Sequence, residues 1–196
     1  MELIIFLRML LKRWWIIVLM LIVTVIGTVL LTEWQTPVYS SSATYVVSPS
    51  PQILNGTSYL SGLSVLGGQP AVTNTYASIA ASASVKQNAS VALELNPAQI
   101  KRLSVFSRVQ AGTNIIEITV EGEDPLLVQA FTVEIGLSTI DYVSKLNGVY
   151  DLQLLDSAMS PESPIRPNIR LNLIIGVVLG LVLGGGIAFL TSLKEY

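Results

Sequence analysis

The sequence has no cysteine and no histidine. Without cysteine the chain cannot form a disulfide, and without both residue types it cannot form a zinc site of the Cys/His kind. Mechanisms in which an imidazole carries the proton are excluded as well, and with them most hydrolase chemistries. We therefore expect no enzymatic activity, no bound metal and no cofactor.

Charged residues are also scarce, at 12% of the 196 residues against 51% hydrophobic ones. Soluble domains carry about 25% charged residues, so this composition points to a membrane protein. Two apolar runs without charge, residues 14–32 and 171–193, are each long enough to cross a hydrocarbon core of about 30 Å as a helix. We predict one transmembrane helix at each of these places.

A basic cluster of Arg8, Lys12 and Arg13 precedes the first apolar run, and Glu33 follows it. The run is longer than the roughly 7 to 15 apolar residues of a signal peptide, and no small-x-small cleavage site follows, so we interpret it as an uncleaved anchor. Because positive charge is retained in the cytoplasm, the cluster predicts a cytoplasmic segment over residues 1–13.

Two spans would return residues 194–196 to the cytoplasm as well. Arg166 and Arg170 on the outer flank of the second run oppose this orientation, and only Lys194 on the inner flank supports it. We expect the basic cluster at the first span to decide the orientation.

Residues 33–170, between the two runs, suffice for one compact extracytoplasmic domain. This segment contains seven Lys and Arg residues and eleven Asp and Glu residues, which gives a net charge of −4. Such a surface does not favour nucleic acid, and we expect no nucleic-acid partner.

Alternation of apolar and polar residues indicates four strands in this segment. The best hairpin signal has Ile116, Ile118 and Val120 on one face of its second strand and a short connection at residues 111–113. The four predicted strands cover residues 37–47, 103–109, 114–121 and 149–155.

Asp124 and Pro125 are typical of the N-cap and first position of a helix. The apolar stripe that we expect to cover the sheet consists of Leu126, Ala130, Val133, Leu137, Ile140 and Val143.

A pair of helices is predicted over residues 73–95, with Ser84 as N-cap of the second. Residues 48–72, rich in Gly, Pro and Ser, are predicted to be a loop, either functional or disordered. Together these elements predict an α+β domain, a small sheet with helices on one face, between two transmembrane helices.

Two features near the second span are candidate structural sites. Pro161, Pro164 and Pro167 lie in a proline-rich segment, residues 158–167, whose spacing matches the three-residue turn of polyproline II. We expect a stiff strut that sets the angle between domain and membrane and favours ring assembly; a plain spacer is the alternative.

Gly176, Gly180 and Gly184 are spaced four apart, which permits close helix packing in lipid. The packing partner is left open: the first span, a neighbouring copy or a polymerase.

A cluster of carboxylates, Glu117, Glu121, Glu123 and Asp124, admits two interpretations. A glycosidase needs two carboxyl groups on either side of the bond that it cleaves. The strand alternation instead makes Glu117 and Glu121 a solvated face and Asp124 a helix cap, and we favour this second interpretation.

Five segments in order resemble the chain length determinant (Wzz) family, the polysaccharide co-polymerases of bacterial surface polysaccharide export. They are a basic cluster with Trp before the first span (FLRMLLKRWWIIV), a Pro-x-Tyr strand (TPVYSSSATYVV), a Tyr-started helix (YASIAASASVKQNASVALEL), a strand that ends on Asp-Pro (NIIEITVEGEDP) and the proline-rich segment (DSAMSPESPIRPN).

This resemblance implies a bacterial plasma-membrane protein that forms homo-oligomers and regulates the chain length and export of a surface polysaccharide, with membrane lipid and a polysaccharide polymerase as partners. The chain departs from the family near VQAFTVEIG, where only Ala130 matches, and it lacks a long coiled-coil helix. It has no glycine-rich phosphate loop, so it is similar to compact adaptor members whose tyrosine kinase is a separate polypeptide. The alternatives are a structural scaffold subunit without a polymer and an adaptor that activates such a kinase, with Tyr196 as a conceivable substrate.

Overall fold

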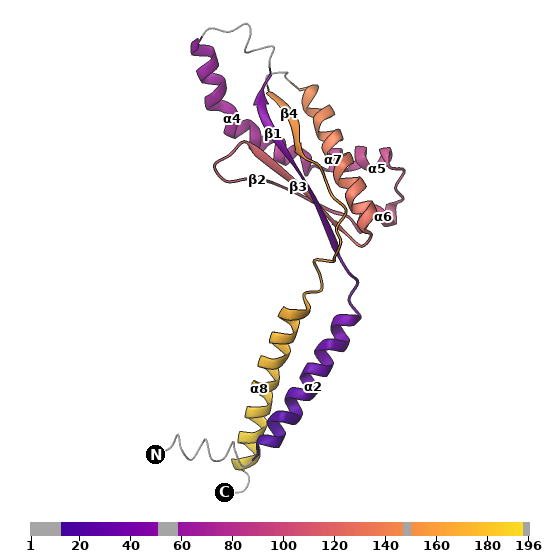
Figure 1. The fold of residues 1–196 in the computed structure, drawn as a ribbon, viewed down its shortest axis with the longest axis vertical. Helices are drawn as coiled ribbons and strands as arrows, with labels where there is room; N and C mark the ends of the chain where they lie inside the picture. The colour runs from indigo at the N-terminus through magenta and orange to yellow at the C-terminus, as the bar shows by residue number, and fades with distance from the viewer. Residues whose placement is uncertain (1–12, 51–58, 147–149, 194–196) are drawn as a thin grey trace. The chain divides into compact units, whose positions relative to one another are not determined.

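The structure, a computed structural model, describes residues 13–50, 59–146 and 150–193. Figure 1 shows helices and strands in an order that mixes the two kinds, with a helix at either end. The elements are α2 (Trp14–Glu33), β1 (Tyr39–Pro49), α4 (Tyr59–Ala80), α5 (Ala83–Ala92), α6 (Pro97–Lys101), β2 (Ser104–Val109), β3 (Ile115–Gly122), α7 (Pro125–Ser144), β4 (Tyr150–Asp156) and α8 (Ile169–Leu193).

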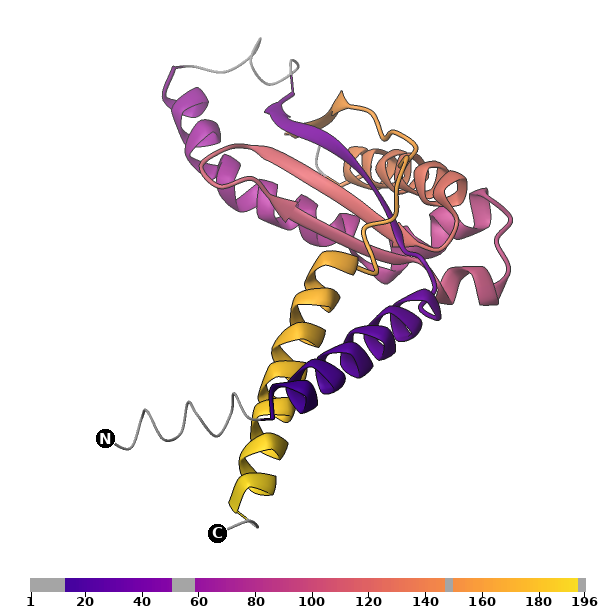
Figure 2. The same cartoon turned by 60° about the horizontal axis from the view of Figure 1, so that its bottom comes forward.

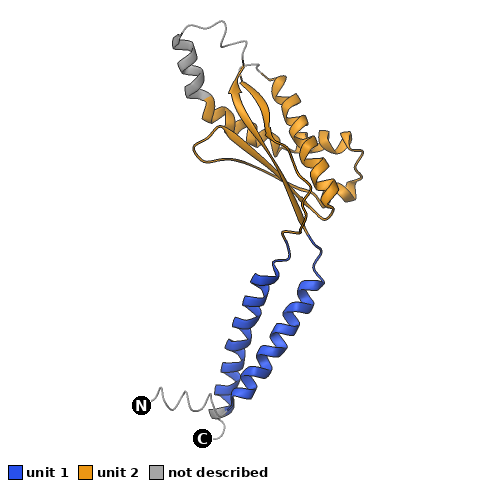
Figure 3. Ribbon diagram, in the orientation of Figure 1, with its two compact units in different colours: residues 1–37, 166–196 blue, residues 38–165 orange. Residues whose placement is uncertain are grey.

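The chain divides into two compact units, coloured separately in Figure 3. The helical unit contains residues 1–37 and 166–196, and the sheet unit contains residues 38–165. The sheet unit lies within the segment 33–170 that the sequence analysis assigns to a single domain.

In the helical unit, α2 and α8 pack against each other along their length, as Figures 1 and 2 show from two directions. Both apolar runs of the sequence thus form helices. Ile16, Thr32 and Ala188 are buried, whereas most of the large apolar side chains of the pair are exposed. An apolar exposed surface is what a helix needs where its solvent is lipid.

Three helices of the described residues, α2, α7 and α8, are long and apolar enough to cross a membrane. Two such helices were predicted from the sequence. The third, α7, differs from the others because Val128, Phe131 and Ile135 are completely buried in the core of the sheet unit. Helix α7 is apolar enough to count as a candidate span because it carries apolar side chains on both its buried and its exposed face.

The sheet has four antiparallel strands in the order β2-β3-β1-β4. The predicted hairpin is confirmed as β2 and β3, and Gly112 in the connection has a φ of 74°, which glycine adopts without strain. Alternation places Ile116, Ile118 and Val120 on the buried face. A short register shift occurs in β1 between Thr44 and Tyr45.

Helices α4 and α7 pack on one face of the sheet, and α5 packs against α7. Asp124 caps α7 as predicted, because its Oδ1 accepts hydrogen bonds from the backbone N–H of Leu126 (2.9 Å) and Leu127 (3.3 Å). The α+β class, a small antiparallel sheet with helices, is confirmed for the sheet unit.

The predicted apolar stripe of α7 was wrong for most of its residues. Leu126 is 70% exposed and Leu137 55%, and Ala130 and Val133 are exposed too. Only Val143 of the predicted stripe is fully buried, and Ile140 is partly buried. The face that covers the sheet consists of Val128, Phe131, Thr132, Ile135, Gly136, Thr139 and Val143.

The physical reason is that hydropathy does not count threonine and glycine as core residues. The hydroxyl of Thr132 donates to the carbonyl of Val128 at 2.7 Å, and that of Thr139 donates to Ile135 at 2.6 Å. Once its own helix satisfies the hydroxyl, a threonine can be buried at little cost.

The prediction of a loop over residues 48–72 was also wrong for residues 59–72, because these belong to α4, which begins at Tyr59. Residues 51–58 lie outside the described residues. Packing against the sheet stabilises this helix despite its glycines and Pro70. Gln69 contributes directly, because its Nε2 donates to the carbonyl of Val47 in β1 at 2.6 Å.

Two features of the next segment differ from the prediction in detail. The N-cap of α5 is Ser82, whose hydroxyl accepts from the N–H of Val85 at 3.3 Å, whereas the predicted cap Ser84 is an exposed residue within the helix. The short helix α6 was not predicted, although Asn96 and Gln99 form a capping box at its start.

Candidate functional site

Of the basic cluster, only Arg13 belongs to the described residues; Arg8 and Lys12 lie outside them. Arg13 occupies the N-cap position of α2, and its side chain makes no capping hydrogen bond there. Its position at the start of the apolar helix is the one expected for a residue that fixes orientation, and that orientation stays a prediction.

The three predicted glycines of α8 all face α2, so the packing partner left open by the sequence is α2 in this structure. A Cβ built on Gly176 would lie 2.5 Å from the Oγ1 of Thr28, and one built on Gly184 would lie 2.8 Å from the Cα of Ile17. On Gly180 it would lie 2.8 Å from the Cα of Leu21 and would also collide with Thr24. Only glycine permits this backbone approach.

Threonines on α2 form the other side of this contact. The hydroxyls of Thr24, Thr28 and Thr32 each donate to a carbonyl one turn earlier, at 3.0, 2.7 and 2.7 Å. The Nδ2 of Asn172 on α8 donates to the Oγ1 of Thr32 at 3.1 Å. This polar pair joins the two helices at one end of the glycine face.

The three prolines are divided between the two units: Pro161 and Pro164 belong to the sheet unit and Pro167 to the helical unit. The segment has no regular secondary structure, and the chain bends at residues 162, 163, 165 and 167. A single straight polyproline II rod, as expected from the spacing, is therefore not present.

The first part of the proline-rich segment is instead tied to the sheet unit by hydrogen bonds. The hydroxyl of Ser41 donates to the carbonyl of Met159 at 2.7 Å, and the Nε2 of Gln129 donates to that of Ala158 at 3.2 Å. Further along, the N–H of Ile165 donates to the carbonyl of Val38 at 2.8 Å. These hydrogen bonds attach residues 158–165 to β1 and α7, and the stiffness of the segment stays a prediction.

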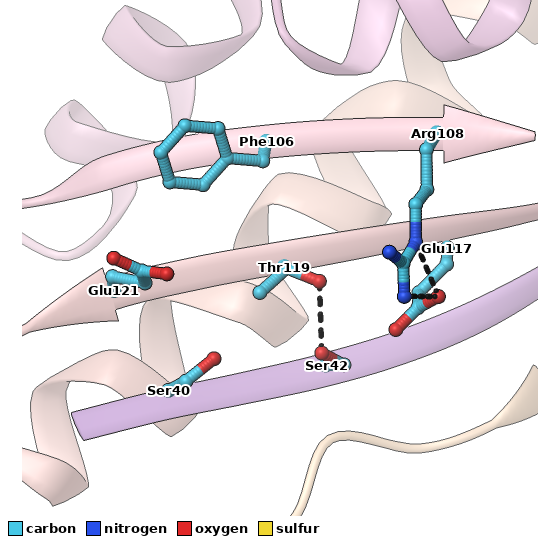
Figure 4. Close-up of a pocket in the computed structure, with 7 residues that line it drawn as sticks. All are labelled: Ser40, Ser42, Phe106, Arg108, Glu117, Thr119 and Glu121. Carbon is cyan, nitrogen blue, oxygen red and sulfur yellow. Dashed lines mark hydrogen bonds and ion pairs between the residues drawn. The ribbon is translucent and has the colours of Figure 1, made fainter. Parts of the chain in front are cut away.

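The face of the sheet away from the helices carries an open groove with a volume of about 340 Å³. Figure 4 shows that its residues come from three adjacent strands and project from the same side. The groove is lined by Ser40, Ser42, Phe106, Arg108, Glu117, Thr119 and Glu121.

The middle of the groove is a row across the three strands. Phe106 of β2 lies opposite Thr119 of β3, which lies opposite Ser42 of β1. The hydroxyls of Ser42 and Thr119 are hydrogen-bonded at 2.8 Å (Figure 4). Phe106 is 53% exposed, so its ring is a large apolar surface among polar groups.

Carboxylates lie on both sides of this middle row. On one side the Nε and Nη2 of Arg108 contact the Oε2 of Glu117 at 2.9 and 2.8 Å. On the other side, Glu121 of β3 lies opposite Ser40 of β1. The groove therefore offers one aromatic ring between the row of the Arg108–Glu117 ion pair and the row of Glu121.

The acidic cluster of the sequence is not gathered into one catalytic pair. Glu123 pairs with Arg102 at 2.7 Å, Asp124 caps α7, and Glu117 pairs with Arg108. These contacts agree with the interpretation of the cluster as a solvated face with a cap.

Two tyrosines on the helix side of the sheet have altered acidity. Burial raises the pKa of Tyr45, and burial together with the charges of Asp151 and Tyr150 raises the pKa of Tyr76. The hydroxyl of Tyr76 donates to the carbonyl of Tyr150 at 3.2 Å. Both side chains are thus neutral at physiological pH and belong to the core.

Comparison with known families gives a match to the model described as "Wzz: Chain length determinant protein" over residues 1–93. The matched Wzz region extends from the N-terminus through α5, and it contains the basic cluster, the Pro-x-Tyr strand and most of the Tyr-started helix. The resemblance that the sequence motifs indicated is confirmed.

A structural comparison extends over the whole chain. A solved structure titled "full-length bacterial polysaccharide co-polymerase" is similar with a TM-score of 0.55 and 12% sequence identity, over 97% of this chain and 97% of that one. At this identity the likeness concerns the fold, and it includes the parts beyond the Wzz match. No curated protein matches the sequence.

The residues of the groove were not predicted as a site. The alternation of residues 103–109 already puts Phe106 and Arg108 on the same face of the strand. The pattern does not indicate which face of the sheet the helices cover. An aromatic residue two positions from an arginine on the polar face of a strand was the available signal.

Proposed function

We propose that the protein is a membrane scaffold that regulates the chain length of an exported surface polysaccharide. The observation that carries this proposal is the Wzz match over residues 1–93, together with the likeness in fold to a solved polysaccharide co-polymerase over 97% of both chains. The protein acts by positioning other components, and the engaged carboxylates of the acidic cluster support a role without bond chemistry.

In this proposal α2 and α8 cross the bacterial plasma membrane and the sheet unit lies outside the cytoplasm. The burial of Val128, Phe131 and Ile135 supports a place for α7 within the domain, because crossing the membrane would remove the core of the sheet unit. The basic cluster before α2 supports cytoplasmic ends.

We further propose that copies of the chain assemble side by side, and the outer face of α7 supports this. Leu126, Ala130, Val133 and Leu137 form an exposed apolar stripe along the helix. Exposed apolar patches on folded domains commonly mark interaction surfaces. Confinement of every copy to one membrane brings identical stripes to the same height, which favours contacts between copies.

The test is to delete the gene and determine the size of the surface polysaccharide by gel electrophoresis. Cells are complemented with the wild type and with a variant in which Pro161, Pro164 and Pro167 are all replaced by alanine. We expect deletion to change chain length or abolish the polymer, the wild type to restore it, and the proline variant to restore it incompletely. An unchanged profile after deletion would contradict the proposal and favour the structural scaffold without a polymer.

A further inference from the structure

The setting of Phe106 distinguishes it from an ordinary exposed apolar residue. A single exposed aromatic side chain needs no explanation. Here, however, the ring is flanked on its own sheet face by hydroxyl and carboxylate groups, in rows that the strand register fixes. Ser42 and Thr119 lie beside it, and the rows of Glu117 and Glu121 lie before and after it (Figure 4).

We propose that this groove binds a segment of neutral polysaccharide, with Phe106 as the stacking platform for a pyranose ring. The C–H face of a pyranose is apolar and packs on an aromatic ring, while the hydroxyls at its rim donate and accept hydrogen bonds. Carboxylate and hydroxyl oxygens stand on both sides of Phe106, where that rim would lie. The inference rests on the proposed function for the source of the polymer.

The dimensions of the groove agree with this ligand. Successive residues on one face of a strand are about 7 Å apart, so the rows of Arg108 and Glu121 leave room for one sugar ring over Phe106. The groove is open, so a chain can enter and leave without threading through an enclosed site. An open site of this kind suits a polymer that grows while it is bound.

Charge selects the class of saccharide. The groove contains one guanidinium, Arg108, and two carboxylates, Glu117 and Glu121. The guanidinium is already paired with Glu117 at 2.8 Å. The one cation among the lining residues is therefore already engaged, so an anionic polymer would gain no available positive charge from them. Neutral hexose segments need no such cation.

The same charges argue against a second protein as the occupant. The centres of protein interfaces are depleted of charged residues, and apolar side chains dominate them. In this groove Phe106 is the sole large apolar side chain among the lining residues. A protein surface laid over it would have to remove the Arg108–Glu117 pair from water, which is costly without further partners.

The decisive experiment replaces Phe106 with the photo-reactive residue p-benzoylphenylalanine in the full chain within cells. This residue keeps an aromatic ring at the position and forms a bond to C–H groups next to it on illumination. We expect a high-mass smear on an immunoblot that periodate or glycosidase treatment collapses to the size of the protein. The matched control carries the same residue at Val91, which is 66% exposed on α5, and should give no such smear.

Two other results would overturn the proposal. A discrete band that protease removes and periodate leaves unchanged would show that a protein covers this face. A yield at Phe106 no higher than at Val91 would show that nothing binds there. If deletion of the gene changes polysaccharide length while Phe106 captures no sugar, the groove proposal fails and the proposed function stands. If Phe106 captures sugar but deletion of the gene leaves the polysaccharide profile unchanged, the groove proposal stands and the proposed control of chain length fails.

A second variant tests the stacking role itself. With the photo-reactive residue at Ser104, on the same face of β2, Phe106→Ala should lower the yield of sugar adduct about fivefold, as expected for the loss of one aromatic contact. Phe106→Tyr should keep the yield close to that of the parent. Equal yields for alanine and tyrosine would contradict a stacking platform. Comparable amounts of membrane-bound protein in all variants would show that folding is not the cause.

Discussion

Tyr45 and Gly136 meet where β1 and α7 approach each other in the core of the sheet unit. A Cβ at position 136 would overlap the hydroxyl and ring of Tyr45. Gly136→Ala should therefore destabilise the protein by about 1–3 kcal/mol, the usual cost of an overpacked core. The measurement is thermal unfolding of the full chain in detergent. Tyr45→Phe in the alanine background should recover part of the loss; an alanine variant as stable as the wild type would contradict the contact.

The acidity of Tyr45 predicts a loss of stability in alkali. Burial raises the pKa of Tyr45 above its ordinary value of 10.0. Between the ordinary pKa, which applies to the unfolded chain, and the raised pKa of the folded chain, the folded chain keeps a proton that the unfolded chain has lost. The free energy of unfolding therefore falls as pH rises through this range. Below pH 10 the contribution is constant. Urea unfolding from pH 8 to 11.5 should show a shallower decline for Tyr45→Phe than for the wild type; parallel curves would count against it.

At the scale of elements, the contact between α2 and α8 depends on which glycines face α2. Gly180→Ile should separate the helices, because even a Cβ there would meet the backbone of Leu21 at 2.8 Å. We expect a lower apparent melting temperature in detergent, corresponding to about 1–3 kcal/mol.

Gly185 is the matched control in the same helix. A Cβ there would meet no heavy atom of the described residues within 4 Å, beyond its neighbours and its own helix backbone. Gly185→Ile should leave the melting temperature close to that of the wild type. Equal effects of the two substitutions would show that helix propensity, and not the contact with α2, determines the change.

The outer stripe of α7 predicts how copies associate. Leu126→Glu combined with Leu137→Glu should lower the mass of the assembly in detergent, because charges would replace apolar groups on the proposed contact surface. Light scattering coupled to size-exclusion chromatography measures this mass. Val91→Glu introduces a charge at an equally exposed apolar position of α5 and should have no effect. An unaltered mass for the double variant would exclude this stripe as the contact.

Local signals in the sequence predicted the elements whose structure depends on local interactions. The β2–β3 hairpin and the Asp124 cap were found because turn and capping preferences act over a few residues. The part of α4 before residue 73 was missed, whereas the rest of it was predicted as the first helix of the pair over residues 73–95. The missed part depends on packing against the sheet, through contacts such as Gln69 with Val47. The stripe of α7 was misplaced because its buried face includes Thr132, Gly136 and Thr139, while apolar residues such as Leu126 and Leu137 are exposed.

Some features of the candidate sites can likewise be predicted from local spacing, whereas others depend on the tertiary structure. Spacing alone identified Gly176, Gly180 and Gly184 as a packing face, and tertiary structure supplied α2 as its partner. The groove around Phe106 required the register of three strands and the side taken by the helices, and neither can be read from a single strand. The proline spacing suggested a rod, whereas hydrogen bonds to Ala158 and Met159 bind the start of the segment to the sheet unit.

At the scale of the whole molecule, three helices qualify as spans by composition, and topology decides between two crossings and three. The absence of cysteine makes this directly measurable, since every introduced cysteine is the sole thiol. Asn88 precedes α7 and Ser160 follows it, and both are exposed in the sheet unit. If α7 stays in the domain, Asn88→Cys and Ser160→Cys lie on the same side of the membrane.

We expect a membrane-impermeant maleimide to label both of these variants in intact spheroplasts, and to label Glu195→Cys only after permeabilisation. If α7 crossed the membrane, Asn88→Cys and Ser160→Cys would respond oppositely, because one crossing would separate them. If the basic cluster failed to set the orientation, all three responses would be reversed. The first pattern places the Phe106 groove on the side where an exported polysaccharide emerges, which the saccharide proposal requires; the reversed pattern would leave that groove facing the cytoplasm and remove its ligand.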